Sequence, residues 1–445
     1  MTKYSVNKSS TKLVENGGSP VRLKEWLGNF TTGNEEVDAA CRAIRSGYLS
    51  KFEGSFTPDP PFSFNGGPEV QKFEHLWCDY YGCNHAISLN SATSGLFASV
   101  GALGLGFGDE IIVSPYTMTA VAAAPLLYGA IPVFADVEAT SGCLDPNEIE
   151  KVITNATKAI IVVHQFGFSA NMEAIMKIAR RYNLKVIEDC AQAHGARFKG
   201  QYVGTFGNIG VFSLNVNKTI QSGEGAVCIT NDEDLSYRLK LIRNHGEAVI
   251  GPAKYKNMTN ILGFNYRMTE VTAAIASEQL KKLNSLNSLR LDLVDFLKNE
   301  LHQYTFLEPL SGNSCCMHCD CKSTQSCVYT YYVFPMRFKK EEINVSRNQF
   351  VSLLEQEGIN FSSGYTPPLY TQPLYIKKHL FKFGYPFTAK ENFGLGQDYK
   401  KGLCPIAEKL HSEEFILSEY IRPPHTISDI QDIIIALKKL LMVSK

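Results

Sequence analysis

A series of short apolar runs between residues 85 and 230 constrains the fold of this chain most strongly. Most of these runs are separated by stretches whose apolar residues recur at helical spacing. Buried strands that alternate with helices are typical of a mostly parallel sheet with helices on both faces. The sequence therefore predicts an α/β fold. The runs cover 85–89, 110–113, 131–134, 159–163, 185–187, 210–214 and 226–230.

The segments around this core predict the domain organisation. Helical spacing also occurs at 35–48 and 70–81, and a long helical pattern without proline covers 268–301. An apolar run at 328–338 and a helical pattern at 427–441 follow it. We expect a large domain joined by a long helix to a smaller C-terminal α+β domain. The predicted divisions are an N-terminal arm at 1–34, the large domain at 35–267, the bridging helix at 268–301 and the small domain at 302–445.

Charge and hydropathy argue against two classes of partner. The chain of 445 residues has 44 Lys and Arg against 44 Asp and Glu, so its formal net charge is zero. Nucleic-acid binding relies on a basic surface, which this balance does not predict. No run of about 18 apolar residues is present, and residues 1–18 have no apolar segment of signal-peptide length. We therefore expect a cytoplasmic protein with no nucleic acid or membrane partner.

Lys218 and Asp189 form the most informative pair of polar residues. Asp189 follows an apolar run, so its carboxylate is expected at the carboxyl end of a buried parallel strand, where ligands bind in open α/β sheets. Lys218 follows the run 210–214 and precedes a Gly-Glu-Gly turn, which places its amine where an aldehyde can reach it. Taken singly, they suggest a solvated surface lysine and a helix cap or turn former. Together they predict pyridoxal phosphate.

The chemistry of this cofactor explains why both groups are needed. The lysine amine can form a Schiff base with the cofactor's aldehyde and later shuttle a proton. A carboxylate beside the ring nitrogen keeps that nitrogen protonated, because it favours the charged form. Lys218 and Asp189 are therefore the predicted catalytic residues.

Further motifs extend this pattern along the chain. They are NSATSGL at 90–96, GDEIIVSPYT at 108–117, EDCAQAHGA at 188–196, FSLNVNK at 212–218, SGEGA at 222–226 and LGFNYRMTE at 262–270. With them, the sequence resembles the DegT-type sugar aminotransferases over nearly its whole length. These enzymes have the aspartate-aminotransferase-like fold, fold type I, so the resemblance implies that fold, pyridoxal phosphate and a homodimer with a shared active site.

The resemblance also implies a reaction. The family moves an amino group from glutamate or glutamine to a keto-sugar, commonly a nucleotide-linked one, or to a related keto-cyclitol. Such reactions serve amino-sugar, polysaccharide or secondary-metabolite biosynthesis. We therefore expect a pyridoxal-phosphate-dependent sugar aminotransferase.

The resemblance assigns residues to each part of the cofactor. Ala92 and Thr93, at a helix start that presents backbone N–H groups, match residues that bind the phosphate, and Ser213 matches a serine that reaches it. Gln192 matches the partner of the ring hydroxyl. Asn265 matches a residue that reaches the phosphate from the neighbouring subunit. From the residues alone, a helix cap at Asn265 and a sheet hydroxyl at Ser213 stay open.

Three more positions bear on the cofactor ring and the substrate. Met118 stands where the family commonly has an aromatic residue that stacks on the ring, and a methionine can also pack there. Tyr370 stands where the family often has a histidine that touches the substrate, which makes Tyr370 a candidate substrate contact. His194 either faces the same cleft or is a buried structural histidine. The loops 51–65 and 365–370 are candidates for substrate selection.

Five of the twelve cysteines crowd into one segment together with His318. Cysteine and histidine at short spacing can bind zinc, but this cluster lacks the paired two-residue spacings of zinc folds. We expect an insertion at 314–327 with reduced cysteines and no metal. The clustered cysteines are Cys315, Cys316, Cys319, Cys321 and Cys327.

Two other functions are compatible with the same scaffold. One is a pyridoxal-phosphate-dependent sugar dehydratase, a branch that has histidine in place of the lysine, so Lys218 argues against it. The other is a non-catalytic homologue kept for binding or regulation, which is motivated by Met118, the loop 51–65 and the cysteine cluster. A spectrum without cofactor absorbance would favour this last interpretation.

Overall fold

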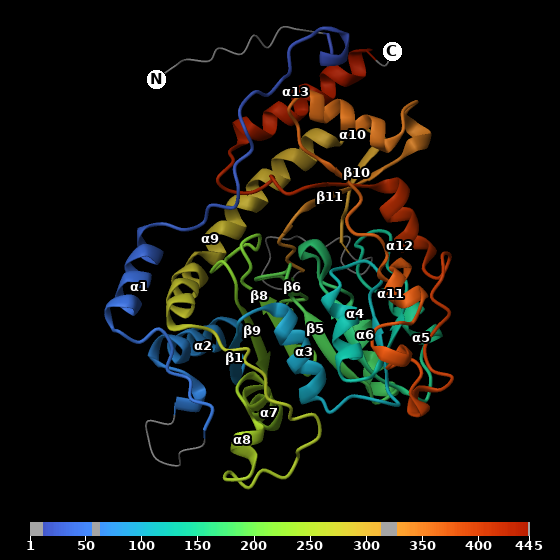
Figure 1. The fold of residues 1–445 in the computed structure, drawn as a ribbon. Coiled ribbons are helices and arrows are strands. Elements are labelled where there is room, and N and C mark those ends of the chain that lie inside the picture. The colour runs from blue at the N-terminus through green and yellow to red at the C-terminus, as the bar shows by residue number, and fades with distance from the viewer. Residues whose placement is uncertain (1–11, 56–62, 313–326, 444–445) are drawn as a thin grey trace.

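The computed structural model describes residues 12–55, 63–312 and 327–443 (Figure 1). Its central feature is a seven-stranded sheet with the strand order β1-β9-β8-β5-β4-β2-β3. Strand β9 is antiparallel to both of its neighbours, and the other pairings in this sheet are parallel. The predicted α/β fold with a mostly parallel central sheet is confirmed.

The strands agree with the predicted apolar runs to within two residues at either end. They are β1 (His85–Leu89), β2 (Glu110–Val113), β3 (Ile131–Phe134), β4 (Thr157–Val163), β5 (Lys185–Asp189), β8 (Ile209–Ser213) and β9 (Ala226–Thr230). A small hairpin, β6 (Arg197–Phe198) with β7 (Gln201–Tyr202), lies outside this sheet. The helices of this part are α2 (Pro68–Tyr81), α3 (Ala92–Ala102), α4 (Ala120–Leu127), α5 (Pro146–Lys151), α6 (Met172–Arg181), α7 (Glu233–Arg243) and α8 (Glu247–Ile250).

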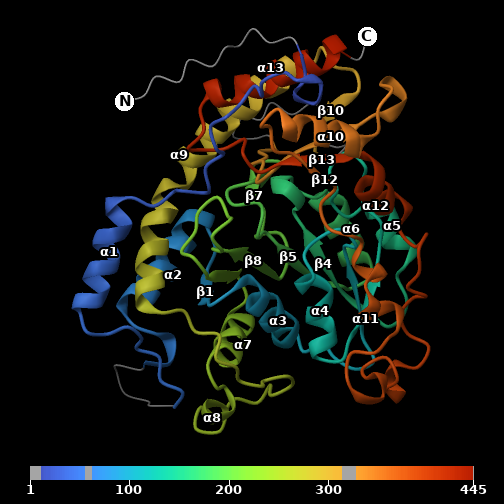
Figure 2. The same ribbon diagram turned by 45° about the horizontal axis from the view of Figure 1, so that its top comes forward.

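Alternating side chains of the strands build apolar cores on both faces of the sheet, where helices cover it (Figure 2). Val211 belongs to the core that includes α3, whereas the next residue, Phe212, packs in the core formed with α2 and α9 (Glu270–Leu301). A Cβ atom at Gly95 of α3 would lie 2.8 Å from a methyl group of Val211. Glycine therefore lets α3 lie close against the sheet, which fixes the start of this helix beside the strand ends.

The long helix α9 leads from the large sheet to a four-stranded antiparallel sheet with the order β10-β11-β13-β12. It begins at Glu270 because the hydroxyl of Thr269 caps it, accepting the N–H of Thr272 at 3.2 Å. Strand β11 begins only at Phe334, later than the predicted run, since Tyr331 with φ of 46° interrupts the extended backbone. This part contains β10 (Leu307–Pro309), β11 (Phe334–Phe338), β12 (Ser362–Ser363), β13 (Phe415–Ser418), α10 (Arg347–Gln356), α11 (Pro373–Ile376) and α12 (Pro405–Lys409).

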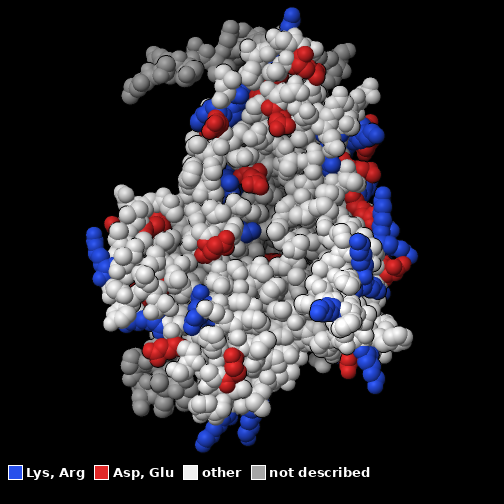
Figure 3. Space-filling model, in the orientation of Figure 1, with Lys and Arg blue, Asp and Glu red and all other residues white. Residues whose placement is uncertain are grey.

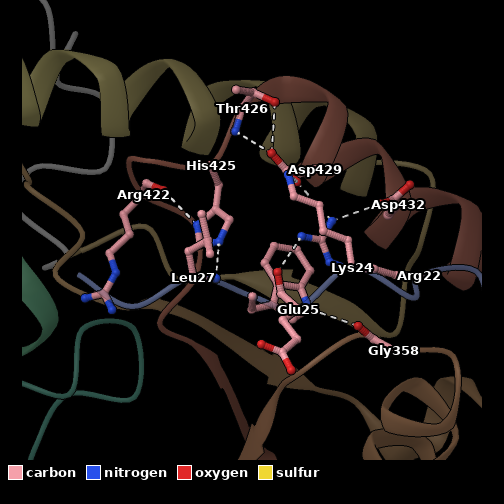
Figure 4. A network of polar contacts seen from close by, with 11 residues as sticks. Arg22, Lys24, Glu25, Leu27, Gly358, Arg422, His425, Thr426, Asp429 and Asp432 are labelled. Carbon is pink, nitrogen blue, oxygen red and sulfur yellow. Dashed lines mark hydrogen bonds and ion pairs between the residues drawn. The ribbon is translucent and has the colours of Figure 1, made fainter. Parts of the chain in front are cut away.

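The N-terminal segment passes alongside the C-terminal helix α13 (Ile427–Val443) before α1 (Asn34–Arg45) packs on α9 (Figure 1). Arg22 contacts both Asp429 and Asp432 at 3.0 Å, and Lys24 contacts Asp429 at 3.1 Å (Figure 4). We call residues 22–29 and 422–432 together the N–C clasp. It joins segments that are far apart in the sequence, since Arg22 and Asp429 are separated by 407 positions and Leu27 and His425 by 398.

Lys and Arg side chains are interspersed with Asp and Glu on the face shown in Figure 3, in keeping with the zero net charge. The same face is hollowed between the upper part of the molecule and the part that contains the large sheet (Figure 3). Among the described residues, no helix is both long and apolar enough to cross a membrane.

Candidate active site

A cleft of about 300 Å³ lies at the carboxyl ends of β5 and β8 and at the start of α3. This is the edge where ligands bind in open α/β sheets, and the volume suits a small cofactor. Its walls come from both parts of the molecule, because Tyr332 and Tyr365 belong to the C-terminal part. The lining residues are Ser91, Ala92, Thr93, Leu96, Thr117, Met118, Thr119, Ala120, Asp189, Ala191, Gln192, Ser213, Asn215, Asn217, Lys218, Glu224, Tyr332 and Tyr365.

Asp189 is the last residue of β5, and its side chain is only 6% exposed. One carboxylate oxygen accepts the N–H of Ala191 at 3.0 Å, and the other has no hydrogen-bond donor among the described residues. Burial raises the pKa of Asp189, while the Ala191 N–H and the charge of Lys218 act to lower it. A cation placed in the cleft would therefore stabilise the ionised carboxylate.

Lys218 lies on the turn after β8, and its Nζ is 4.4 Å from the centre of the Tyr332 ring. Among the described residues no carboxylate lies within ion-pair distance of this amine, which therefore stays available for chemistry. Hydrogen bonds hold both the backbone N–H and the backbone carbonyl of Lys218. The Lys218 N–H donates to the carbonyl of Asn215 at 2.9 Å, and the amide of Asn29 donates to the carbonyls of Val216 and Lys218 at 2.9 and 2.7 Å.

The start of α3 forms the opposite end of the cleft. Ser91 caps the helix with its hydroxyl, which accepts the N–H of Ser94 at 3.1 Å. The first N–H groups of a helix, here those of Ala92 and Thr93, have no partner within the helix and attract anions. Ser213, at the end of β8, accepts the N–H of Asn215 at 3.3 Å, which leaves its hydroxyl proton free to donate. This end of the cleft can bind a phosphate.

These donors and acceptors fit pyridoxal phosphate. The helix start can take the phosphate, the open oxygen of Asp189 can accept from the protonated ring nitrogen, and the amine of Lys218 can take the aldehyde. The cleft thus brings together every group predicted for the cofactor within one subunit, Met118 and Gln192 included.

Gln192 and Tyr365 both line the cleft and connect the two parts of the molecule through a hydrogen bond. The amide oxygen of Gln192 accepts the N–H of Phe166 at 2.7 Å, and its amide nitrogen donates to the hydroxyl of Tyr365 at 3.1 Å. One N–H of the amide is left to reach a ligand. Met118 lies at the mouth, where its side chain is 53% exposed.

A second network of buried hydrogen bonds fixes the end of the strand that carries Asp189. Glu188 accepts backbone N–H groups of the loop 204–207 at 2.7 to 2.8 Å and contacts Nε2 of His164 at 3.0 Å. Nδ1 of His164 accepts the N–H of Ala170 at 3.1 Å, so the ring proton is on Nε2. The backbone N–H of His164 donates to the carbonyl of Asp189 at 3.0 Å. The position of Asp189 is therefore fixed from both sides of its strand.

Two candidate substrate residues lie away from the cleft. Tyr370 is fully buried beside Phe134 and donates to a carboxylate oxygen of Glu408 at 2.5 Å, so it is a core residue and not a residue of the cleft as the sequence suggested. His194 is 1% exposed and packs against Trp77, which is the structural alternative. Burial, and secondly the charge of Lys218, lower the pKa of His194 to about 3, so the ring is neutral.

The predictions for the loop 51–65 and for the cysteine insertion at 314–327 have different outcomes. None of the described residues of the loop 51–65 lines the cleft. Most of the cysteine insertion, including His318 and four of its cysteines, lies outside the described residues. Cys327 is disulfide-bonded and fully buried, which differs from the expected reduced state.

Sequence reasoning missed several residues at the cleft. Tyr332 lies within the apolar run 328–338, which was assigned only to a strand. Asn29 lies in an irregular segment without periodicity, and its contact with the lysine turn gives no local signal. Glu224, the acidic residue of the Gly-Glu-Gly turn, also lines the cleft, whereas its motif predicts only a turn.

The fold and the cleft together define an enzyme of the fold type I class that depends on pyridoxal phosphate. The sequence profile of the DegT/DnrJ/EryC1/StrS aminotransferase family matches residues 62–390. The chain belongs to this family and is a pyridoxal-phosphate-dependent aminotransferase.

Similar proteins cover most or nearly all of the chain. The L-glutamine:2-deoxy-scyllo-inosose aminotransferase of Streptoalloteichus tenebrarius is 30% identical, over 96% of this chain and 97% of the relative. GDP-perosamine synthase of Escherichia coli O157:H7 is 33% identical, over 70% of this chain and 80% of the relative. The crystal structure of an aminotransferase from Psychrobacter cryohalolentis covers 95% of this chain and 100% of its own, with a TM-score of 0.77 and 26% identity.

Proposed function

We propose that this protein transfers an amino group from glutamate or glutamine to a keto-sugar, commonly a nucleotide-linked one, or to a related keto-cyclitol. The product would serve amino-sugar, polysaccharide or secondary-metabolite biosynthesis. One observation carries the proposal: a single cleft contains the amine of Lys218, the open carboxylate oxygen of Asp189 and the N-terminus of α3.

In this proposal Lys218 and Asp189 are the catalytic residues. Bound pyridoxal phosphate supplies the electron sink that makes the α-carbon of the amino donor acidic. The Nζ of Lys218 takes the proton from that carbon as a general base and returns it as a general acid. The carboxylate of Asp189 holds a proton on the ring nitrogen, because the negative charge stabilises the protonated form.

The other residues of the cleft position the cofactor. The N–H groups of Ala92 and Thr93 and the hydroxyl of Ser213 bind the phosphate, and Gln192 contacts the ring hydroxyl. Met118 packs against the ring with its thioether. The division into an arm, a large domain, a bridging helix and a small domain remains part of the proposal, as does the cytoplasmic location.

The names of two relatives support the range of acceptors. One is named for glutamine as donor and a deoxy-inosose as acceptor, and the other for the synthesis of a GDP-linked amino sugar. They share the family and differ in acceptor, so a keto-cyclitol and a nucleotide-linked keto-sugar both belong in the first substrate screen.

A homodimer is part of the proposed function. Asn265 is exposed and does not line the cleft of its own subunit, which fits a residue that reaches the phosphate site of a second copy. It is not the cap of α9, since Thr269 fills that role. Two apolar side chains at the cleft are exposed: Met118, which lines it, is 53% exposed, and Val216, between the lining residues Asn215 and Asn217, is 49% exposed. Apolar surface of this kind is typical of an interface.

The ultraviolet-visible spectrum of the purified protein tests this function. We expect a visible band from the lysine-bound cofactor that disappears when L-glutamate or L-glutamine is added and returns when a suitable keto-sugar or keto-cyclitol follows. A protein that shows no such band, even with added pyridoxal phosphate, would contradict the proposal and favour a binding role.

A further inference from the structure

Residues 377–401, which lie between α11 and α12, carry a local excess of positive charge. They contain six lysines and two acidic residues, so this segment has a net charge of +4 while the rest of the chain carries −4. One of the two acids, Asp398, is paired with Lys400 at 2.7 Å. Lys382 and Lys390 are exposed and form no ion pair within the described part of the chain. Several Lys and Arg side chains project at the lower right of Figure 3, where α11 lies.

The same segment exposes aromatic side chains. Phe393 is 92% and Phe383 is 82% exposed, and no other large apolar side chain of the described residues is more exposed than these two. Phe381 and Tyr385 are also exposed, at 51% and 45%. None of the four rings stacks on another described ring or cation. Their apolar surface is therefore available to a partner.

The exposure of these rings does not come from a loose loop, because the backbone of the segment is anchored. The side chain of Asn392, which is 2% exposed, accepts the N–H of Gly108 at 2.7 Å and donates to the carbonyl of Gly129 at 2.8 Å. The amide of Gln397 contacts both the N–H and the carbonyl of Phe134, at 2.7 and 2.9 Å, in the edge strand β3. The segment thus turns polar side chains toward the protein and phenyl rings toward solvent.

This arrangement indicates a docking surface, since several exposed apolar side chains in one place mark an interaction site. Its details fit a lipid bilayer. Phe383 and Phe393 each precede a glycine with positive φ, so both rings stand at turns and apart from each other. A protein interface has a packed apolar centre with a polar rim, whereas a fluid bilayer can take up separate rings. Lysines beside such rings attract the phosphate groups of anionic lipids.

We propose that residues 377–401 dock the protein on the surface of a membrane that contains anionic phospholipids. Phe383 and Phe393 enter the boundary between headgroups and acyl chains, while Lys382 and Lys390 contact the headgroup phosphates. The contact is with the bilayer surface and needs no spanning helix. The zero net charge and the lack of a long apolar run, which argued against a membrane partner, do not exclude a local surface of this kind.

The docking surface is separate from the candidate active site. No residue of the segment 377–401 lines the cleft. The chain between α11 and α12 lies at the periphery of the molecule, on the side opposite α1 (Figures 1 and 2). Substitutions in this segment can therefore test docking without changing the residues proposed for amino transfer.

Flotation of the cofactor-loaded, full-length protein with lipid vesicles tests the proposal. We expect binding to vesicles of phosphatidylcholine mixed with phosphatidylglycerol, weaker binding when salt is added, and little binding to phosphatidylcholine alone. The double variant Phe383→Ser, Phe393→Ser should weaken binding by about 100-fold or more, because each ring contributes about tenfold or more when buried. Leu289→Ser, at a side chain of α9 that is 54% exposed, is the matched control and should bind like wild type.

The lysines are tested by a second double variant. Lys382→Gln with Lys390→Gln should weaken binding to the mixed vesicles by roughly 10-fold to 30-fold, and this variant keeps the test valid if the serine variant fails to fold. Lys158→Gln, at an exposed lysine outside the segment, is the control. Phe393→Trp adds a direct probe, since the fluorescence of the new indole should shift to shorter wavelength on mixed vesicles and stay unchanged on phosphatidylcholine.

Four results would overturn the docking surface. They are wild-type protein that does not bind the mixed vesicles, binding that neither double variant weakens, equal binding to both kinds of vesicle, and an unshifted Phe393→Trp spectrum. A smaller mass of the Phe383→Ser, Phe393→Ser protein in lipid-free sedimentation would instead assign the surface to contact between copies of this chain. Amino transfer to a soluble acceptor should be the same in all variants, so docking and the proposed function are tested independently.

Discussion

Two regions meet at Lys218, and they are held in different ways. On one side, Asp189 and the start of α3 are carried by strand ends and a helix that are anchored in a continuous apolar core. On the other side, the N–C clasp joins an irregular N-terminal segment to the start of α13 through ion pairs, single hydrogen bonds and ring contacts of Trp26. Segments with few apolar contacts open more readily than a buried sheet. The clasp is therefore expected to loosen under conditions in which the cofactor end of the cleft stays intact.

The strongest test of the sheet side is the lysine itself. Lys218→Ala removes the group that moves the proton, so we expect turnover to fall by about 10⁴-fold or more while folding is unaffected. Steady-state amino transfer measures the loss, and circular dichroism checks the fold. Lys158→Ala, at an exposed lysine, is the control and should be fully active. A Lys218→Ala enzyme with a tenth of the wild-type rate would contradict the assignment.

Asp189→Asn tests the other catalytic residue of the same side. The amide has the shape of the carboxylate but cannot hold the proton on the ring nitrogen, so we expect a loss of roughly 10²-fold to 10³-fold in rate. The half-reaction with L-glutamate, followed by absorbance, isolates this step from acceptor binding. Full activity in Asp189→Asn would show that the carboxylate is structural. Asp79→Asn, which changes an exposed carboxylate, should have no effect.

Arg22→Gln breaks the clasp and sharpens the comparison. The Arg22 side chain is 2% exposed, and its loss leaves Asp429 buried with only Lys24 and Thr426 as partners. We expect the free energy of local unfolding of residues 13–29 to fall by about 3 kcal/mol. Removing one partner of a buried ion pair leaves the other charge buried and less well compensated. Hydrogen exchange should show this fall in the clasp and not in β5 or β8.

The control for this comparison is an ion pair on the surface. Arg181→Gln removes a pair with Glu150 in which both side chains are exposed, and should change stability by no more than about 1 kcal/mol. Equal loss of protection in the clasp and in the large sheet would mean that the two regions unfold as one unit. That result would show that the clasp and the large sheet do not differ in local stability.

Asn29→Ala tests the connection between the two regions. The substitution removes two hydrogen bonds to the carbonyls of Val216 and Lys218, each worth about 1 kcal/mol. We expect faster hydrogen exchange at 215–219 and a reduction of roughly tenfold in the L-glutamate half-reaction, with the midpoint of thermal unfolding nearly unchanged. A wild-type half-reaction rate would mean that the arm does not support the lysine turn.

The smallest expected effect is a pH dependence of the clasp. Burial lowers the pKa of His425, so the unfolded chain takes up this proton before the folded chain does. The contribution of His425 is thus fully present above the unfolded pKa of about 6.5 and declines as pH falls below it. Protonation of Nε2 would remove the acceptor for the N–H of Leu27.

Trp26 fluorescence can follow this change, because the indole lies 5.0 Å from the His425 ring. We expect the signal of a Trp77→Phe protein to change as the pH falls below about 6.5, and to stay flat when His425→Asn is added. Titration of Asp429 in its ion pair with Arg22 does not explain a change in this pH range. Burial alone would raise the pKa of Asp429, but the Thr426 N–H, Lys24 and Arg22 lower it, so its contribution is lost only at more acidic pH.

The sheet side of the cleft could be predicted from the sequence because its signals are local. The apolar run that becomes β5 ends at an acidic residue, and this places Asp189 at the strand end without any knowledge of the rest of the chain. Short runs at 85–89, 110–113, 131–134 and 226–230 became strands with those bounds.

The clasp side could not be predicted, for physical reasons that lie in its contacts. Asn29 and Arg422 contact backbone carbonyls of a turn that is distant in sequence, and Arg290 contacts a side-chain hydroxyl of the same turn. Such contacts leave no periodic pattern. For Tyr370, by contrast, a local motif led to a wrong prediction. Its motif position suggested a substrate contact, yet its apolar neighbours and Glu408 draw it into the core.

The N–C clasp also sets an order of events during synthesis. Residues 22–29 are made well before their partners at 422–432, since Arg22 and Asp429 are 407 positions apart. Contacts of such high sequence separation form late, because a long loop must close before they contribute. The nascent chain can complete its central sheet first, and the arm that supports the turn with the reactive amine is held in place only once the clasp has formed.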